Sequence, residues 1–296
     1  MSELPKELLS IPHRVNVPFA KLTTLGMGGV CRWLFEPTTE EGAALFVRTC
    51  RAHGIEYGVL GGGSNLLVLS DVAWPVMRLR LPKELKPTPS GVYAGASHSH
   101  KALARDVADM GLSGLEWAAG IPGSLGGALR MNAGAFGSNW GMVLDRVRFV
   151  APNGEIIEKA PEEGDFGYRS SFLVGGRVAL GAAVRLARGD AASIKRTMAK
   201  HQADRRGTQP TGRSAGCVFK NPPGQSAGQL IDSAGLKGAR IGGVAVSELH
   251  ANFFLNLGAG SPNDFMELAL LVGTKVFEAH GVKLELEVEV WGKVCG

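Results

Sequence analysis

Glycine clusters are the feature that most constrains what this chain can fold into. Glycine accounts for 42 of the 296 residues, roughly twice the average usage of about 7%. The excess gathers at 61–63, 120–127 and 134–137 and has no collagen-like period. Because glycine has no Cβ atom, such clusters allow the backbone itself to approach a neighbour or a ligand closely. We therefore expect several glycine turns at places where close contact is needed.

Helix and strand patterns surround the first glycine cluster. Thr38 and Glu41 form a capping-box pattern, which predicts a helix that ends near His53. Ile55–Leu60 predicts a short buried strand that leads directly into Gly61–Gly63. A helix, a strand and a glycine turn in this order describe an α/β unit with a ligand loop at the end of the strand.

Later segments predict a second α/β unit and a change in the sequence pattern near residue 190. The region 114–127 is too rich in glycine for a regular element, and Asn153-Gly154 is a strong hairpin signal between Leu144–Ala151 and Glu155–Lys159. Ser261 followed by Pro262 is a typical helix start. Regular elements are expected at Val92–Ala96, Ser97–Met110, Leu144–Ala151, Glu155–Lys159, Arg177–Leu186, Ala191–His201, Ser261–His280 and Leu284–Trp291, with a loop at Arg205–Arg213.

Composition excludes several classes of protein. The net charge of +5 is dispersed along the chain, unlike the basic stripe of a nucleic-acid-binding surface, and it suits an anionic small molecule. The four cysteines form no CxxC pair, which fits a reducing compartment. No stretch approaches about 18 apolar residues, and the first residues lack a signal-peptide core. We expect a soluble, cytoplasmic protein that binds neither nucleic acid nor membrane, and His98-x-His100 lacks a third ligand, so no metal is expected.

The segment GGGSNLL at 61–67 is a candidate phosphate loop. It is neither GxGxxG nor a P-loop, because no GK[ST] follows. Three glycines after a strand free successive backbone N–H groups to form an anion nest, and Ser64 and Asn65 add side-chain donors. The alternative is a tight surface turn without a ligand. Because glycine turns recur at 120–127 and 134–137, a long phosphate-bearing cofactor laid across several turns is the favoured interpretation.

Six segments in order carry a resemblance to a known family. They are GGGSNLL, GLEWAAGIPGSLGGALRMNAGAFG, YRSSF, SAGCVFKNP, AGQLIDSAGLKG and SELHANFFLN. The set resembles the UDP-N-acetylenolpyruvoylglucosamine reductase family, and the resemblance spans about residues 15–292. GGGSNLL alone is shared with other flavoproteins of the vanillyl-alcohol-oxidase-like superfamily.

The resemblance implies an α+β protein with a two-part, PCMH-type FAD-binding region and a C-terminal α/β substrate-binding domain. The expected boundaries are 15–190 for the FAD-binding domain, with subdomains of about 15–82 and 83–190, and 191–296 for the substrate domain. The residues that the resemblance assigns to FAD binding are Gly61, Gly62, Gly63, Ser64, Asn65, Leu66, Gly120, Ile121, Pro122, Gly123, Ser124, Gly126, Gly127, Asn132, Gly134 and Ala135.

The implied reaction passes a hydride from NADPH to FAD and then to the enolpyruvyl group of UDP-N-acetylglucosamine enolpyruvate. Arg169, in YRSSF, is implied to hold the substrate carboxylate, since a guanidinium is a permanently charged fork that matches it. As charge flows into the carboxylate, this contact strengthens. From the chain alone, a solvated loop arginine is equally plausible.

Cys217 occupies the position of the family's proton donor, which is serine or cysteine. A thiol with the ordinary pKa of about 8.5 is mostly protonated at neutral pH and can deliver a proton; without the resemblance, a small buried hydrophobe is the favoured interpretation. Glu285, Glu287 and Glu289 share one face of the expected strand, so periodicity cannot choose among them. The family pattern selects Glu287 to orient or assist the proton donor.

Substrate contacts are expected from Tyr168, Lys220 and Asn221. Arg205 and Arg206 are candidate partners of the diphosphate, with a solvated charge pair as the alternative. No inserted segment is evident between 169 and 213, which resembles the shorter family type that lacks a tyrosine-bearing closing loop.

Two other functions remain open, and a monomer is expected. One is another FAD-dependent sugar or alcohol oxidoreductase of the same superfamily, which has no reason to carry the whole motif set. The other is a non-catalytic binding module, which would be expected to lose Arg169, Cys217 or Glu287.

Overall fold

The computed structural model describes residues 4–292, which divide into two units built from separate stretches of sequence. The first unit contains the residues up to Val15, Trp33–Gly62 and Trp74–Asp204, and the second contains Asn16–Arg32, Gly63–Ala73 and the residues from Arg205 on. The predicted boundary near 190 lies at the start of a helix, whereas the chain changes unit at Asp204/Arg205. The substrate-binding role of 191–296 stays a prediction.

A four-stranded sheet has the order β1-β2-β5-β3, and β3 is parallel to β5. The chain changes unit within β1, β2 and β5. The bounds are β1 His13–Pro18, β2 Val30–Phe35, β3 Gly58–Val59 and β5 Val72–Met77. The strand predicted at Ile55–Leu60 is therefore much shorter than expected.

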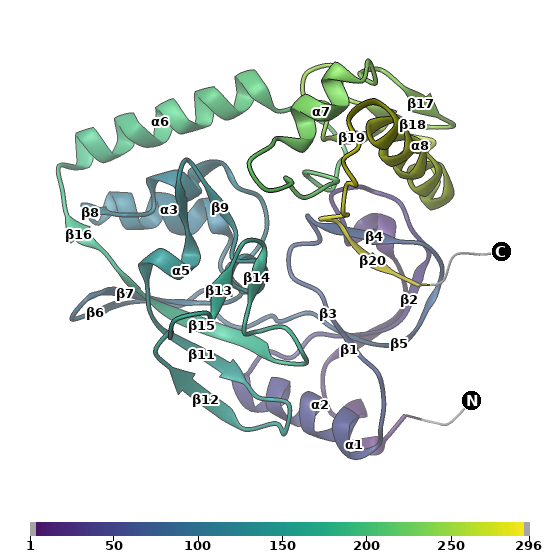
Figure 1. Cartoon of the computed structure of the whole chain (residues 1–296). Helices are drawn as coiled ribbons and strands as arrows, with labels where there is room; N and C mark the ends of the chain where they lie inside the picture. Colours follow the sequence, from purple (N-terminus) through teal and green to yellow (C-terminus); the bar gives the residue numbers. More distant parts are fainter. Residues whose placement is uncertain (1–3, 293–296) are drawn as a thin grey trace. The chain divides into compact units, whose positions relative to one another are not determined.

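Helices α1 (Lys6–Leu9) and α2 (Glu40–Ala52) contact each other in the first unit (Figure 1). The extended Thr39 caps α2, because its hydroxyl accepts a hydrogen bond from the Gly42 N–H at 3.0 Å. Thr38 was the predicted cap, so the prediction was wrong by one residue. The fully buried Phe46 and Val47 set which side of α2 faces the core. This packing determines at which residue the helix begins.

The second sheet of the first unit is antiparallel, with the order β12-β11-β15-β7-β6. Val150 opposes Ile156 in the hairpin, which confirms the hairpin predicted around Asn153-Gly154. Seven of the eight residues of β15 are buried, because α4 contacts this central strand. The bounds are β6 Leu85–Thr88, β7 Gly91–Gly95, β11 Leu144–Val150, β12 Ile156–Lys159 and β15 Val178–Arg185.

Two short helices occupy the glycine-rich region that was predicted to be irregular. They are η2 (Glu116–Gly120) and α4 (Leu125–Arg130). Ser124 caps α4 by accepting a hydrogen bond from the Gly127 N–H at 3.4 Å. Glycine is tolerated here because a Cβ at Gly126 would lie only 3.1 Å from the Cβ of Ala96. The prediction was wrong because this close packing compensates for the low helix propensity of glycine.

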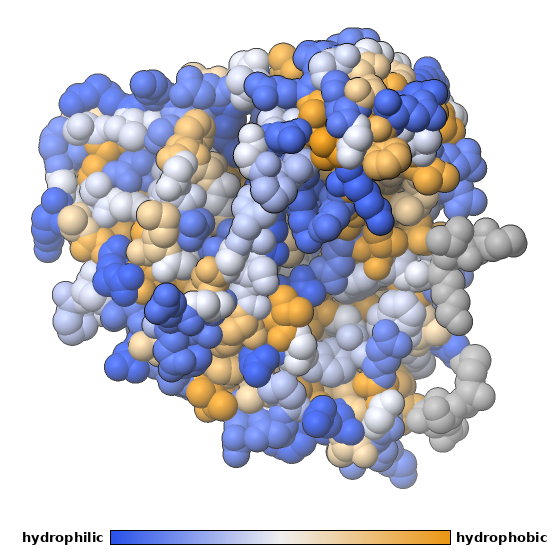
Figure 2. All heavy atoms as spheres, in the orientation of Figure 1, coloured by the Kyte–Doolittle hydropathy of each residue, from blue (hydrophilic) through white to orange (hydrophobic). Residues whose placement is uncertain are grey.

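Helix α3 (His100–Asp109) starts after Ser99 and has no side-chain cap, two residues later than the predicted Ser97. Helix α6 (Ala191–Thr208) is longer than predicted and includes Arg205 and Arg206 in its last turn, where a loop was expected. Only Ile194 and Met198 of α6 are buried, and the face of this helix visible in Figure 2 is largely hydrophilic.

Short elements complete the first unit. Three small two-stranded pairs join β8 to β16, β9 to β10 and β13 to β14, all antiparallel. The bounds are β8 Leu112–Ser113, β9 Gly134–Ala135, β10 Ser138–Asn139, α5 Trp140–Val143, β13 Phe166–Gly167, β14 Ser170–Ser171 and β16 Ala187–Arg188.

In the second unit, α8 (Pro262–His280) confirms the predicted helix. Ser261 and Asp264 form a reciprocal capping box, and Gly281 ends the helix with a φ of 68°. Only the end of the predicted strand Leu284–Trp291 is regular, as β20, which pairs in parallel with β4. The remaining bounds are η1 Phe19–Lys21, β4 Leu66–Val68, α7 Ala227–Ser233, β17 Arg240–Ile241, β18 Val244–Val246, β19 Phe254–Asn256 and β20 Glu289–Trp291.

Separate apolar cores support the two units. The first unit has one core around Leu103, Trp140 and Val184 and another around Phe35, Phe46 and Met77. The second unit has a core that joins Leu25, Met27 and Leu67 to residues of β18, β19 and α8. Among the described residues, no helix is both long enough and apolar enough to cross a membrane.

Candidate functional site

The two glycine loops of the first unit lie against each other. A Cβ at Gly61 would lie 2.9 Å from the Ser124 hydroxyl oxygen, and a Cβ at Gly62 would lie 2.6 Å from the Gly123 Cα. Real Cβ atoms essentially never show contacts under 3.0 Å. Glycine at 62 is therefore required because one backbone packs directly on the other, and a side chain at 61 would displace the Ser124 hydroxyl.

This contact gathers backbone donors that have no acceptor. Within residues 4–292, the N–H groups of Gly61, Gly62, Gly123 and Ser124 make no hydrogen bond. Polar backbone groups that are not paired within the protein normally find water or a ligand, and neighbouring N–H donors of this kind are suited to an anion. These residues fit the diphosphate of a dinucleotide cofactor.

Other predicted cofactor-binding residues use their backbone groups internally. Ile121 donates its N–H to the Ala118 carbonyl at 3.1 Å, Gly126 donates to Ala96 at 3.0 Å, and Pro122 has no N–H. Gly120 ends η2. Such residues can contact a cofactor only through their remaining atoms.

The second half of the GGGSN segment belongs to the second unit and is tied to its C-terminal strand. Gly63 has a φ of 64°, and a Cβ there would collide with the Leu22 carbonyl oxygen. The Asn65 side-chain amide donates to the Glu287 carbonyl at 3.0 Å, and the Glu289 N–H donates to the Asn65 carbonyl at 3.0 Å. Asn65 was predicted as a cofactor contact, and its link to Glu287 was not foreseen. The predicted contacts of Ser64 and Leu66 stay predictions.

The loop at 132–137 is held by the side chain of Asn132. Its amide donates to the Gly167 carbonyl at 2.9 Å, and its carbonyl accepts the Gly141 N–H at 2.9 Å. Asn132 also has a φ of 43°, which asparagine tolerates better than most residues. Asn132 thus shapes the turn that contains Gly134 and Ala135.

Arg169 lies at the tip of the β13–β14 hairpin, in the first unit. Its φ is 53°, an uncommon conformation for a non-glycine residue and one that gathers at functional sites. Its guanidinium carbon lies 5.3 Å from the ring centre of Tyr168, which is 57% exposed. The hairpin thus presents a charged side chain and an aromatic side chain together.

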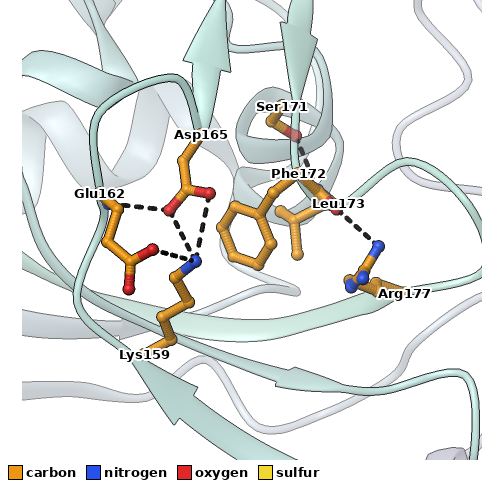
Figure 3. Close-up of polar contacts among 7 residues, drawn as sticks. All are labelled: Lys159, Glu162, Asp165, Ser171, Phe172, Leu173 and Arg177. Atoms are coloured by element: carbon orange, nitrogen blue, oxygen red, sulfur yellow. Dashed lines mark hydrogen bonds and ion pairs between the residues drawn. The ribbon is translucent and has the colours of Figure 1, made fainter.

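Polar contacts fix the base of this hairpin (Figure 3). The Lys159 ammonium lies 3.0 Å from the Asp165 carboxylate and 5.3 Å from the ring centre of Phe172. Burial raises the pKa of Asp165, but the Glu162 N–H and the Lys159 ammonium outweigh it, so this pKa lies below its ordinary value. Arg177 donates to the Phe172 carbonyl at 3.1 Å. These contacts hold the two ends of the hairpin and so restrict where its tip can lie.

In the second unit, Cys217 and Glu287 lie on directly paired backbone segments. The Glu287 N–H donates to the carbonyl of Val218, the neighbour of Cys217, at 2.8 Å. Phe219 and Leu286 form an antiparallel bridge in the same pairing. The segments that contain the predicted proton donor and its predicted carboxylate partner are thus joined by backbone hydrogen bonds.

Lys220 and Asn221 follow on the same segment. The Lys220 ammonium lies 3.5 Å from the Glu285 carboxylate, and both side chains are largely exposed. The Asn221 carbonyl accepts the Ala227 N–H at 3.0 Å and so supports the start of α7. Arg169 belongs to the other unit, so its approach to Cys217 stays a prediction.

His98 and His100, the two histidines considered as metal ligands, lie in apolar surroundings. His100 is fully buried, and its Nε2 accepts the Trp140 indole N–H at 2.8 Å. His98 is buried, which lowers its pKa. No group of three metal-ligating side chains gathers within residues 4–292.

Comparison with known proteins identifies the family. A model of the C-terminal domain of UDP-N-acetylenolpyruvoylglucosamine reductase matches residues 209–291, and a model of an FAD binding domain matches residues 32–159. A UDP-N-acetylenolpyruvoylglucosamine reductase from Rubrobacter xylanophilus is 39% identical over 285 residues, which cover 95% of each chain. The chain belongs to the UDP-N-acetylenolpyruvoylglucosamine reductase family.

Further relatives of the reductase family agree with this assignment. The reductase of Anoxybacillus flavithermus is 36% identical and covers 99% of this chain and 100% of the relative. The crystal structure of the Thermus caldophilus reductase is 40% identical, has a TM-score of 0.81 and covers 95% of this chain and all of that one. A berberine bridge enzyme, at 15% identity and a TM-score of 0.51, shares the fold alone.

The family assignment fixes the class of protein. The chain is an FAD-dependent oxidoreductase with the α+β fold of PCMH-type flavoproteins, as the resemblance implied. Membership of the reductase family supports FAD and NADPH as its cofactors. The sequence interpretation missed two asparagines, Asn65 as a partner of Glu287 and Asn252 beside Cys217. Asn252 lies in the turn before β19, where asparagine is common, so no local signal singled it out.

Proposed function

We propose that this protein reduces UDP-N-acetylglucosamine enolpyruvate to UDP-N-acetylmuramate with NADPH, as a step of peptidoglycan precursor synthesis in the cytoplasm. One observation carries this proposal beyond family membership. The segments of Cys217 and Glu287 are joined through the Glu287–Val218 hydrogen bond of 2.8 Å. A thiol and a carboxylate on paired backbone suit the protonation that completes such a reduction.

FAD would be held by the N–H groups that lack an acceptor, those of Gly61, Gly62, Gly123 and Ser124. These donors suit its diphosphate. When bound and reduced by NADPH, FAD would supply the hydride that adds to the vinyl group. The loops at 63–66 and 132–135 would complete the contacts.

Arg169 would hold the carboxylate of the enolpyruvyl group. A guanidinium makes two parallel hydrogen bonds to a carboxylate and remains charged at any working pH. Because negative charge moves into this carboxylate during reduction, the contact stabilises the transition state more than the ground state. The uncommon φ of 53° at Arg169 supports a functional constraint on this residue.

Cys217 would deliver the proton. Its S–H bond breaks as the new C–H bond forms on the substrate carbon, and the thiolate left behind regains a proton from solvent. Glu287 would orient the thiol and assist this exchange, directly or through water. Both groups reach the substrate from fixed backbone, which favours a productive geometry.

The nucleotide sugar would contact Tyr168, Lys220 and Asn221. The ion pair between Lys220 and Glu285 is exposed, with side-chain exposures of 42% and 72%, and exposed pairs contribute at most about 1 kcal/mol. An anionic substrate group can therefore take over the Lys220 ammonium at low cost.

A single assay tests this proposal. The purified protein should be yellow, and UDP-N-acetylglucosamine enolpyruvate should stimulate its oxidation of NADPH with formation of UDP-N-acetylmuramate. A flavin-loaded protein that consumes oxygen with a sugar or an alcohol, and ignores this substrate, would instead indicate an oxidase of the same superfamily. A protein that binds the nucleotide sugar without turnover would indicate a binding module.

A further inference from the structure

The segment that contains Cys217 lies outside the regular sheets, and isolated bridges with a few hydrogen bonds hold it on both sides. On one side Cys217 forms an antiparallel bridge to Phe253, and on the other Phe219 forms one to Leu286. The Val218 carbonyl accepts the Glu287 N–H at 2.8 Å on the second side. The thiol therefore depends for its position on a few hydrogen bonds rather than on a continuous ladder.

Asn252 makes most of these bonds on the first side. Its side-chain carbonyl accepts the Phe219 N–H at 2.9 Å, and its side-chain amide donates to the Phe219 carbonyl at 2.8 Å. Its backbone carbonyl accepts the Val218 N–H at 2.8 Å. One residue thus satisfies three backbone groups in the two positions that follow Cys217.

The side chain of Asn252 behaves like a piece of strand backbone. A primary amide, like a peptide group, carries both N–H donor and carbonyl acceptor atoms, and here one bond of each kind goes to Phe219. Asn252 is only 2% exposed, so water cannot replace a lost bond. Its own N–H donates to the Nδ1 of His250 at 3.2 Å, which fixes the clamp itself.

We propose that Asn252 is a positioning residue for the Cys217 thiol, fixing the backbone of 217–219 so that the thiol and Glu287 keep one relation to each other. This inference rests on the proposed function and deepens it. Two sets of hydrogen bonds hold opposite sides of this segment. Asn252 binds Val218 and Phe219 on one side, and the Glu287 N–H binds the Val218 carbonyl on the other. When the two side-chain bonds of Asn252 are lost, Phe219 loses both of its partners on this side, and the segment keeps the Val218–Asn252 backbone bond and the pairing with 285–287.

The chain offers a matched control in Asn256. This residue lies four positions further on, is 7% exposed, and also uses both ends of its amide for backbone bonds. Its partners are the Leu25 carbonyl and the N–H groups of Gly258 and Gly260, none of which belongs to the Cys217 segment. Asn252→Asp and Asn256→Asp remove the same donor and introduce the same acid at buried sites of one unit.

The test separates flavin reduction from proton delivery in the FAD-loaded enzyme. Stopped-flow absorbance should show that NADPH reduces the flavin of Asn252→Asp at the wild-type rate. Reoxidation of the reduced flavin by UDP-N-acetylglucosamine enolpyruvate should slow by about 100-fold, the loss expected when a reacting group is misplaced by about 1 Å. Asn256→Asp should slow neither step by more than a few fold.

A second readout reports on the thiol itself. In a Cys295→Ser background, iodoacetamide should alkylate Cys217 selectively, because Cys31 and Cys50 are buried and burial raises the pKa of Cys50 to about 12. The pH dependence of this alkylation should differ between Asn252→Ser, which adds no charge near the thiol, and wild type, and it should be unchanged in Asn256→Ser. A purely structural role would leave this profile unmoved.

Three results would overturn the proposal. They are wild-type reoxidation in Asn252→Asp, an equal loss in both half-reactions, and an equal loss in the two aspartate variants. If Asn252→Asp does not fold, Asn252→Ser must show the slow reoxidation with normal flavin reduction. If neither Asn252 variant folds but Asn256→Asp does, the proposal is wrong and Asn252 serves stability alone. A wild-type enzyme that never turns over this substrate would instead defeat the proposed function, which keeps the two failures distinct.

Discussion

The close approach of the two glycine loops makes Gly62→Ala a sharp perturbation. The added methyl would lie 2.6 Å from the Gly123 Cα, 3.0 Å from its carbonyl carbon and 3.1 Å from the Ser124 nitrogen. All three neighbours are backbone atoms, so no side chain can rotate away. To regain the 3.4 Å of ordinary contact, the loops must separate by about 0.8 Å.

The free-energy cost of Gly62→Ala can be taken from overpacking in other protein cores. An extra methyl group forced into a packed site typically costs about 1–3 kcal/mol. If bound FAD needs the loops at their native separation, this strain opposes binding. The dissociation constant for FAD should then rise by about 5- to 150-fold, and the unfolding temperature of the cofactor-free protein should fall.

Flavin fluorescence titration of the cofactor-free protein measures this change directly. Gly207→Ala is the matched control, because Gly207 lies in α6 and has no atom within 4 Å of an added Cβ. Alanine there should raise stability slightly, since glycine is the poorer helix former. FAD affinity in Gly62→Ala within twofold of the Gly207→Ala value would refute the role of these loops in holding the diphosphate.

Three further predictions concern the second unit. The N–H groups of Ser261 and Gly243 hold the pKa of Asp264 below its ordinary value. The stabilisation is full above the unfolded pKa of about 3.9 and is lost as pH falls through the folded value, so the stability gap between wild type and Asp264→Asn in urea unfolding should shrink toward pH 2. Cys217→Ala should keep flavin reduction by NADPH in stopped-flow experiments but lose product formation; normal product formation would exclude Cys217 as proton donor. The fragment 205–296 should show no cooperative unfolding by circular dichroism, because residues 16–32 and 63–73 complete its core, and a cooperative transition would contradict this.

Local signals predicted α8 well. Ser261, Pro262 and Gly281 each favour a helix end by the conformation of a few neighbouring residues, and the structure has all three in these roles. Where two candidates stood side by side, as with Thr38 and Thr39, local chemistry could not choose. The register of α2 is set by the burial of its apolar face, a tertiary effect.

Distant pairings limited what the sequence could predict of the site. Motif spacing and family resemblance pointed to Cys217 and Glu287, but not to what holds them. The Asn65–Glu287 bond joins residues 222 positions apart, and no local period encodes such a contact. The expected regular strand at 284–291 is interrupted because both the Glu287 and Val288 N–H groups approach one carbonyl, that of Val218.

Asn65 shows why a motif cannot be assigned to one ligand by its position. GGGSN reads as a single phosphate loop, yet its first two glycines pack on Gly123 and Ser124 in one unit. Its asparagine donates to the Glu287 carbonyl in the other unit. Since parallel pairing of β4 with β20 continues from this bond, the strand that leaves the glycine turn also positions the backbone of Glu287, which is bonded to the Val218 carbonyl next to Cys217. If the first two glycines hold the cofactor and Cys217 and Glu287 deliver the proton, a change in this short loop would act on both steps, and separate measurement of the two half-reactions would tell the effects apart.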